Sequence, residues 1–291
     1  SEAPEPAELG DSGADPGASL ADAAVVRSAR GVVLPVLGAR GDRLLVRTPC
    51  GEELDAAPSG LTPVSAEVVL DPGHGGDERG AVGPTGLEEK AVNLAVARAA
   101  RAELAGAGVR AALTREADYR LTLDGRAAIV GALAPKAFVS IHHNAEPDGA
   151  STRPGAETYY QIRSAASKRL AGLIYEEALA AIAPHGSAWT ADLDAGAKYR
   201  LNSRGGDYYA VLRQNAATPS ALAELLFIVS PAEERLLRDP AFLAVEGAAV
   251  ARGVLRFLRT KDPGSGFVEP YPRSAPAGPG GGRSGCVDPP L

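Results

Sequence analysis

A chain of 291 residues is long enough for one large domain or two modest ones, and 45% hydrophobic residues are typical of a folded core. A formal net charge of −6 and an isoelectric point near 5.4 argue against nucleic acid or an anionic membrane as a partner held by bulk electrostatics. No apolar run approaches the roughly 20 residues that a bilayer span requires, so we predict no membrane span.

The two ends of the chain hold few large apolar side chains. We therefore predict a disordered N-terminal segment over residues 1–23 and a Pro/Gly-rich C-terminal tail over residues 261–291. Because the chain begins at Ser1 without a signal segment and contains no Met, we interpret it as a mature form whose leader has been removed, or as an engineered start.

The two cysteines, Cys50 and Cys286, lie far apart in sequence and away from the histidines, which argues against metal ligation. We favour an oxidised pair, which would tether the tail to the N-terminal part of the chain, as an oxidising compartment permits. Two unrelated free thiols are the alternative.

The first expected elements are short β-like runs at 32–38 and 43–49, joined by a turn. They predict a hairpin or a small β appendage over residues 24–65, which carries no catalytic residues.

From residue 66 onward, short β-branched runs alternate with helical stretches. This βαβαβ rhythm predicts a single three-layer α/β domain over residues 66–260. Residues 185–207 lack a clear period, and we expect a loop near the mouth of a site. The expected strands are 67–71, 109–113, 137–142, 157–162 and 221–229, and the expected helices are 89–107, 122–133, 167–183 and 242–258.

Histidines follow two of the expected strands. His74 stands in a glycine-rich turn, DPGHGG, and His142 and His143 stand in SIHHNA. Since ligands bind at the carboxyl ends of parallel strands, the two segments predict a metal site, with Glu88 or Glu89 at the start of the first long helix as a carboxylate ligand. Two imidazoles and a carboxylate leave a fourth position open for water, as catalytic zinc requires, although manganese or iron would also suit these ligands.

Each of these residues has a simpler interpretation when it is taken alone. A glutamate at a helix start commonly interacts with the helix dipole, and a single histidine at a strand end is more often structural. Glu224, within the apolar run ALAELLFIV, is a candidate general base, because burial of a carboxylate is costly and raises its pKa. The alternative is a glutamate on a strand edge that faces solvent.

Taken in order, these motifs resemble the amidase-3 type of zinc-dependent N-acetylmuramoyl-L-alanine amidases. The resemblance covers roughly residues 67–258 and rests on VVLDPGHGGDERGA, GLEEKAVNLAVA, LTREAD, LTLDGRAAIV, FVSIHHNA, ETYY and ALAELLFIVSPAEE. It implies a twisted, mainly parallel six-stranded sheet flanked by helices, and one zinc ion per chain.

The resemblance also implies a role for each candidate residue. His74, Glu89 and His142 match the zinc ligands, and Glu224 matches the catalytic glutamate. Glu88 falls on a position that the family does not use as a ligand. His143 does so too, and it replaces a residue that is usually small.

The function implied is hydrolysis of the amide bond between N-acetylmuramic acid and the L-alanine of the stem peptide by zinc-activated water, with Glu224 as the proton acceptor and donor. We expect a monomer that is secreted, periplasmic or associated with the cell wall and that acts on peptidoglycan or muropeptides. Arg115 or Arg126 would orient a stem-peptide carboxylate, unless they form structural ion pairs. The competing hypotheses are a zinc peptidase acting on stem-peptide cross-links and a non-catalytic peptidoglycan-binding protein.

Overall fold

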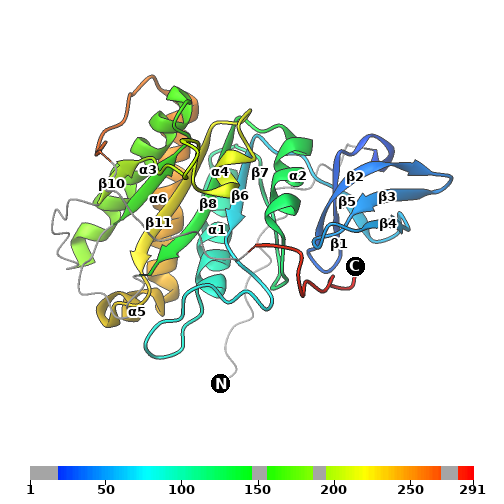
Figure 1. Cartoon of the computed structure of the whole chain (residues 1–291), viewed down its shortest axis with the longest axis horizontal. Helices are drawn as coiled ribbons and strands as arrows, with labels where there is room; N and C mark the ends of the chain where they lie inside the picture. The colour runs from blue at the N-terminus through cyan, green and yellow to red at the C-terminus, as the bar shows by residue number, and fades with distance from the viewer. Residues whose placement is uncertain (1–18, 146–155, 186–194, 270–280) are drawn as a thin grey trace.

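Two β sheets, one large and one small, organise the chain (Figure 1). The computed structural model describes residues 19–145, 156–185, 195–269 and 281–291. Most of the predicted disordered segment 1–23 lies outside the described residues. The middle of the predicted loop 185–207 and part of the predicted tail 261–291 do so as well.

The large sheet has six strands in the order β10-β9-β11-β8-β6-β7. Strands β7, β6, β8 and β11 run parallel to one another, whereas β9 is antiparallel to β11 and parallel to β10. This confirms the mainly parallel six-stranded sheet. Its strands are β6 (Val68–Pro72), β7 (Ala111–Leu113), β8 (Ala137–Asn144), β9 (Glu157–Tyr160), β10 (Gly196–Lys198) and β11 (Ser220–Phe227).

Helices cover both faces of the large sheet and make three layers. The helices α1 (Glu89–Gly106), α3 (Ala165–Ile182) and α6 (Pro240–Arg259) pack on one face, and α2 (Leu123–Leu133) and α4 (Ala210–Arg213) pack on the other. Because both faces are covered, the central strands are continuous apolar runs and not alternating ones. The helix α2 begins at Thr122, whose hydroxyl accepts a hydrogen bond from the amide of Gly125.

Among the strands and α-helices of the α/β part, three short ones were not expected from the sequence. They are the edge strand β10, the helix α4 and the helix α5 (Pro231–Leu237). The first of them lies inside the segment predicted to be a loop, so that prediction is wrong for residues 196–198. Elements of three to seven residues are too short to show a period, and β10 forms because β9 offers an open edge.

The N-terminal strands form a five-stranded antiparallel sheet in the order β4-β3-β2-β1-β5. The predicted hairpin is present as β2 and β3. Apolar residues of this appendage pack against Tyr119, Leu121 and Ile129, which joins it to the larger part of the chain. Its strands are β1 (Val25–Ser28), β2 (Val33–Arg40), β3 (Arg43–Arg47), β4 (Glu53–Ala56) and β5 (Leu61–Pro63), preceded by the 3-10 turn η1 (Leu20–Asp22); a second such turn, η2 (Ala183–His185), follows α3.

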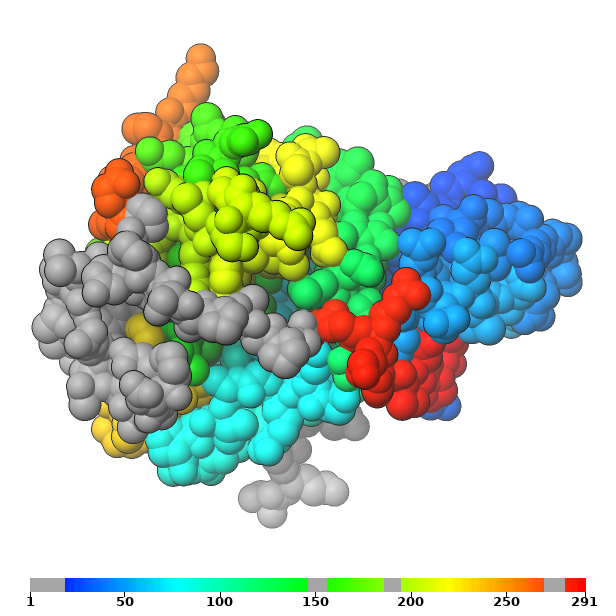
Figure 2. Space-filling model, viewed as in Figure 1, coloured from blue at the N-terminus to red at the C-terminus, as the bar shows by residue number. Residues whose placement is uncertain are grey.

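A disulfide joins Cys50 to Cys286, which confirms the predicted oxidised pair. The C-terminal segment from Gly281 lies on the surface between the appendage and the larger part (Figure 2). The amide of Gly281 donates to Glu78 at 2.6 Å, and its carbonyl accepts from the amide of Leu123 at 2.9 Å. The disulfide ties the tail to the turn after β3, and the hydrogen bond from Gly281 to Glu78 holds it against the loop that follows β6.

Removal of the disulfide is expected to destabilise the chain. The bond closes a loop with a sequence separation of 236 residues, so reduction gives the unfolded chain more conformational freedom. Changing Cys50→Ser together with Cys286→Ser should lower the free energy of unfolding by about 2–4 kcal/mol. Urea denaturation measures the difference. Reduction of the unchanged chain should give the same shift, and an unchanged midpoint in both cases would contradict the expectation.

The buried carboxyl group of Glu233, in α5, accepts a hydrogen bond from the amide of Phe227 at the end of β11. Burial, with a contribution from the charge of Glu246, raises the pKa of Glu233 to about 7, against 4.5 for an ordinary glutamate. Between these pH values the folded chain keeps a proton that the unfolded chain has lost. The contribution of Glu233 to the free energy of unfolding therefore falls as the pH rises from 4.5 to 7.

The Glu233→Gln variant is expected to lack this fall, because glutamine resembles the protonated acid at every pH. Its free energy of unfolding should exceed that of the unchanged chain by up to about 3 kcal/mol at pH 8 and by little at pH 4.5. Denaturation at both pH values measures the difference. Glu103→Gln, at an exposed site in α1, is the control. The same difference at both pH values would argue against the raised pKa.

Candidate active site

His74 lies in the turn that follows β6 and has a backbone φ of 60°. This left-handed conformation is uncommon for a residue with a side chain, and it persists only where the surroundings hold it. Two buried arginines do so here. Arg126 donates to the carbonyl of His74 at 2.8 Å, and Arg115 donates to the carbonyls of Pro72 and Gly73 at 3.1 and 3.0 Å.

Arg126 also pairs with Asp71, the buried acid of β6. Burial favours the neutral acid, but the charge of Arg126 and hydrogen bonds from Thr114 and Ser140 outweigh it and lower the pKa of Asp71. The ion pair thus anchors the turn to the sheet. Arg126 thus forms the structural ion pair considered for it and also lines the cleft at the carboxyl ends of the strands, whereas Arg115 forms hydrogen bonds to backbone carbonyls.

Two glycines leave room for the side chains of the site. A Cβ atom on Gly73 would lie 2.1 Å from Cε1 of His142, and one on Gly80 would lie 2.4 Å from Oε2 of Glu89 and 2.6 Å from Cδ2 of His74. No side chain fits at either position. The glycine-rich turn is therefore required by the close approach of the three site residues.

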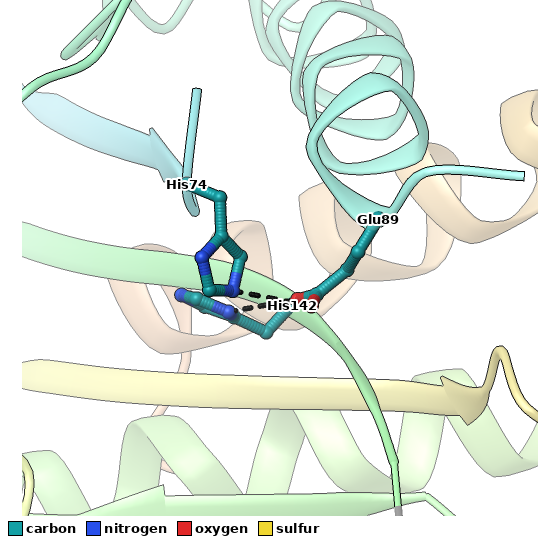
Figure 3. A group of neighbouring side chains, drawn as sticks. All are labelled: His74, Glu89 and His142. Atoms are coloured by element: carbon teal, nitrogen blue, oxygen red, sulfur yellow. Dashed lines mark hydrogen bonds and ion pairs between the residues drawn. The ribbon is translucent and has the colours of Figure 1, made fainter. Parts of the chain in front are cut away.

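Glu89 is the first residue of α1, and its carboxylate reaches the neighbouring rings of His74 and His142 from one side (Figure 3). Nε2 of His74 is 3.1 Å from Oε2, and Nδ1 of His142 is 2.9 Å from Oε1. The three ligand atoms lie within 4.8 Å of one another, so the structure brings together all three predicted ligands.

The exposure of the three side chains differs. The side chain of Glu89 is 4% exposed, whereas those of His74 and His142 are 31% and 20% exposed. Burial favours the neutral form of Glu89, but the charges of the two imidazoles and their hydrogen bonds hold its pKa well below the usual range. Burial lowers the pKa of His142, although Glu89 opposes this. Neutral imidazole beside an ionised carboxylate is the state in which such groups bind a cation.

Glu224 lies on β11, beside His142 in the parallel register. Both side chains line a cleft of about 530 Å³ at the carboxyl ends of the strands, together with His74. The opposite wall is formed by α2, α4 and the tail. Tyr209 also lines the cleft. Burial raises its pKa to about 12, and the negative charge of Glu224 contributes to this rise. The residues of α2, α4, the tail and the neighbouring loops that line the cleft are Glu78, Leu123, Arg126, Arg200, Tyr208, Tyr209, Ala210, Val211, Arg213 and Gly281.

A β-bulge follows Glu224, where the pairing of β11 with β8 shifts before Phe227. Bulges beside active sites bend a strand and change the direction of a side chain. Here the bulge falls between Glu224 and Phe227, directly after the candidate proton carrier.

Two neighbours of the ligands are directed elsewhere. Glu88 pairs with Arg79 at 2.6 Å. The ring of His143 lies on the opposite face of β8 from His142, where it contacts Asn93 and Glu246. Sequence reasoning singled out neither of these two partners. Asn93 could have been noticed as an asparagine within the helical segment EKAVNL, whereas no sequence pattern marks Glu246.

Ligands of parallel α/β sheets bind at the carboxyl ends of the strands, and here that cleft is lined by imidazoles and carboxylates, groups that an enzyme uses to hold a metal and transfer protons. Residues 68–256 match the amidase-3 family, described as N-acetylmuramoyl-L-alanine amidase. The chain therefore belongs to the N-acetylmuramoyl-L-alanine amidase family. It is an enzyme that cleaves the amide bond between N-acetylmuramic acid and the L-alanine of peptidoglycan.

Relatives and solved structures agree with this assignment. The N-acetylmuramoyl-L-alanine amidase AmiA of Escherichia coli is 32% identical over 67% of this chain and 77% of its own length. The germination-specific N-acetylmuramoyl-L-alanine amidase of Bacillus subtilis is 30% identical over 68% of this chain and 83% of its own. The structure of the amidase AmiC2 of Nostoc punctiforme superposes with a TM-score of 0.55 at 32% identity, over 67% of this chain and 99% of that one.

Proposed function

We propose that this amidase uses a zinc ion held by His74, Glu89 and His142, with Glu224 as the group that transfers protons. The observation that carries the proposal is the convergence of three ligand atoms within 4.8 Å at the edge of the cleft that Glu224 also lines. A non-catalytic protein of this fold would not need all four groups.

The ligands fit zinc by their chemistry. Two imidazole nitrogens and one carboxylate, with no thiolate among them, are a common set for catalytic zinc. Gly73 and Gly80 leave the space that the side chains of these three ligands occupy. When bound, zinc would supply a Lewis acid that polarises the amide carbonyl and makes water more acidic.

Glu224 accepts a proton from the attacking water and returns it to the nitrogen of L-alanine as the carbon–nitrogen bond breaks. The products are a carboxylate on the muramic acid lactyl group and a stem peptide with a free amine. The position of Glu224 beside His142 in the sheet supports this role, because the two side chains share one face of adjacent strands. Two strand ends thereby present the proton carrier and a metal ligand to one substrate bond.

We propose further that the enzyme acts outside the cytoplasm as a monomer, secreted, periplasmic or bound at the cell wall. The disulfide supports this location, because such bonds persist in oxidising compartments. Among the described residues no helix has the length and apolar character that crossing a bilayer demands. The proposed division is residues 66–260 as the catalytic domain and 24–65 as the β appendage, between an N-terminal segment and a tail.

Digestion of purified peptidoglycan tests the reaction. The expected products, identified by mass spectrometry, are stem peptides with a free L-alanine amine, in amounts equal to the sugar carboxylates released. Opened cross-links would indicate a peptidase, and new reducing ends would indicate a glycosidase. Metal analysis of the same preparation should find one zinc ion per chain, and activity should disappear on chelation and return with zinc.

A further inference from the structure

A buried series of polar side chains connects the closing helix α6 with Glu89. Oε1 of Glu89 accepts from Nδ2 of Asn93 at 3.1 Å, and Oδ1 of Asn93 is 2.8 Å from Nδ1 of His143. Nε2 of His143 is in turn 3.2 Å from Oε2 of Glu246. The series therefore crosses from α1 through β8 to α6.

The direction of each hydrogen bond follows from the donors available. Asn93 uses its amide nitrogen toward the carbonyl of Gly73 and toward Glu89, so its oxygen is left to accept from His143. Nδ1 of His143 therefore carries a hydrogen, which fixes the rotation of the ring. The backbone amide of His143 donates to the same Oε1 of Glu89 at 3.1 Å. Oε1 of Glu89 therefore accepts from two donors, the side chain of Asn93 and the backbone of His143, and these two residues are themselves joined by a hydrogen bond.

Packing alone does not account for this pair. The side chains of His143 and Glu246 are 0% exposed, and the other buried residues of α6, such as Val250, are apolar or glycine. An apolar pair of similar size is often as stable as a buried ionic pair or more so, because neither group then loses hydration. Buried polar side chains have a function where they fix the orientation of a neighbouring group, as the residues that hydrogen-bond to metal ligands do.

We propose that Glu246 is a positioning residue for the metal site, acting through His143 and Asn93 on the carboxylate of Glu89. The proposal rests on the zinc site of the proposed function. Glu246 sets the ring of His143, the ring sets the amide of Asn93, and the amide holds Oε1 of Glu89 beside His142. Removal of Glu246 leaves the three ligands and the backbone donors to Glu89, the amides of Ala81 and His143, in place, but it loosens the side-chain hydrogen bond from Asn93 to Oε1.

The affinity for zinc, measured by competition with a chromophoric chelator, tests this without reference to activity. Glu246→Leu fills the space but cannot form the hydrogen bond, and it should weaken zinc binding roughly tenfold. Glu246→Gln can still hydrogen-bond to His143 and should restore affinity to within about twofold of the unchanged chain. Val250→Ala, one turn further along the same buried face of α6, should lower stability but leave zinc affinity unchanged.

Equal affinities for Glu246→Leu and the unchanged chain would overturn the proposal, as would an equal loss in Val250→Ala. Should Glu246→Leu fail to fold, His143→Leu breaks the same series and should give the same loss. Asn93→Ala should weaken binding at least as much, and adding Glu246→Leu to it should cost little more, because the two act in series. Full additivity would show that Glu246 acts by another route. If the unchanged chain binds no zinc, the proposed metal site itself is wrong.

Discussion

The Glu224→Gln variant is expected to keep its zinc and to lose amide hydrolysis by a factor of about 10² to 10⁴, the usual contribution of a general acid–base group. Glutamine has nearly the same shape as glutamate but cannot accept a proton from water or return it to the leaving nitrogen. Because Glu224 is not within the group of ligand atoms, zinc binding should be unaffected. Initial rates on a soluble muropeptide, with zinc measured in the same sample, give both results.

Glu78→Gln is the matched control for this variant. Glu78 lines the same cleft, and one of its oxygens accepts from the amide of Gly281. The amide oxygen of glutamine can accept in the same way, so the rate should stay within a few fold of the unchanged chain. A Glu224→Gln variant that retains the full rate would remove Glu224 as the proton carrier.

The adjacent pair Glu88 and Glu89 offers a second sharp comparison. Glu89→Gln is expected to weaken zinc binding by more than about 100-fold and to abolish hydrolysis, since loss of an outer partner of a ligand already costs about 10- to 100-fold. The carboxylate charge is lost at the centre of the ligand set, and a neutral amide binds zinc poorly. Equilibrium dialysis against zinc and the hydrolysis rate measure the two effects.

Glu88→Gln should leave both measurements nearly unchanged. Its carboxylate forms surface ion pairs with Arg79 and Lys90, and exposed pairs of this kind contribute little to stability. The two variants differ by one position in the chain and by nothing else in chemistry. Equal effects of the two substitutions, or unchanged zinc binding in Glu89→Gln, would contradict the ligand assignment.

Much of the fold could be predicted because its signals are local. The apolar run at 68–70 and the periodic stretch from Glu89 place a strand and a helix within one or two residues of their observed bounds. Histidines directly after two buried strands indicate a shared edge, because parallel strands end on the same side of a sheet. The long elements and the neighbourhood of His74 and His142 therefore follow from the sequence.

The partners of each side chain were decided by tertiary structure. Residues 142 and 143 must point to opposite faces of a strand, but only the packing of α1 and α6 on one face shows that His142 opens onto the cleft. The same packing brings Glu246 to His143 across 103 positions of the chain. No local pattern encodes this contact, because the periodicity of apolar residues reports only on neighbours along the chain.

By itself, then, the sequence determined the order of the longer strands and helices of the α/β part, the residues able to bind a metal, and the family resemblance that separated Glu89 from Glu88. The tertiary structure alone decided the edge strand β10, the tail held against Glu78 and the polar series behind Glu89. The physical reason is range: backbone preference and apolar periodicity act over a few residues, whereas these contacts depend on how distant segments pack.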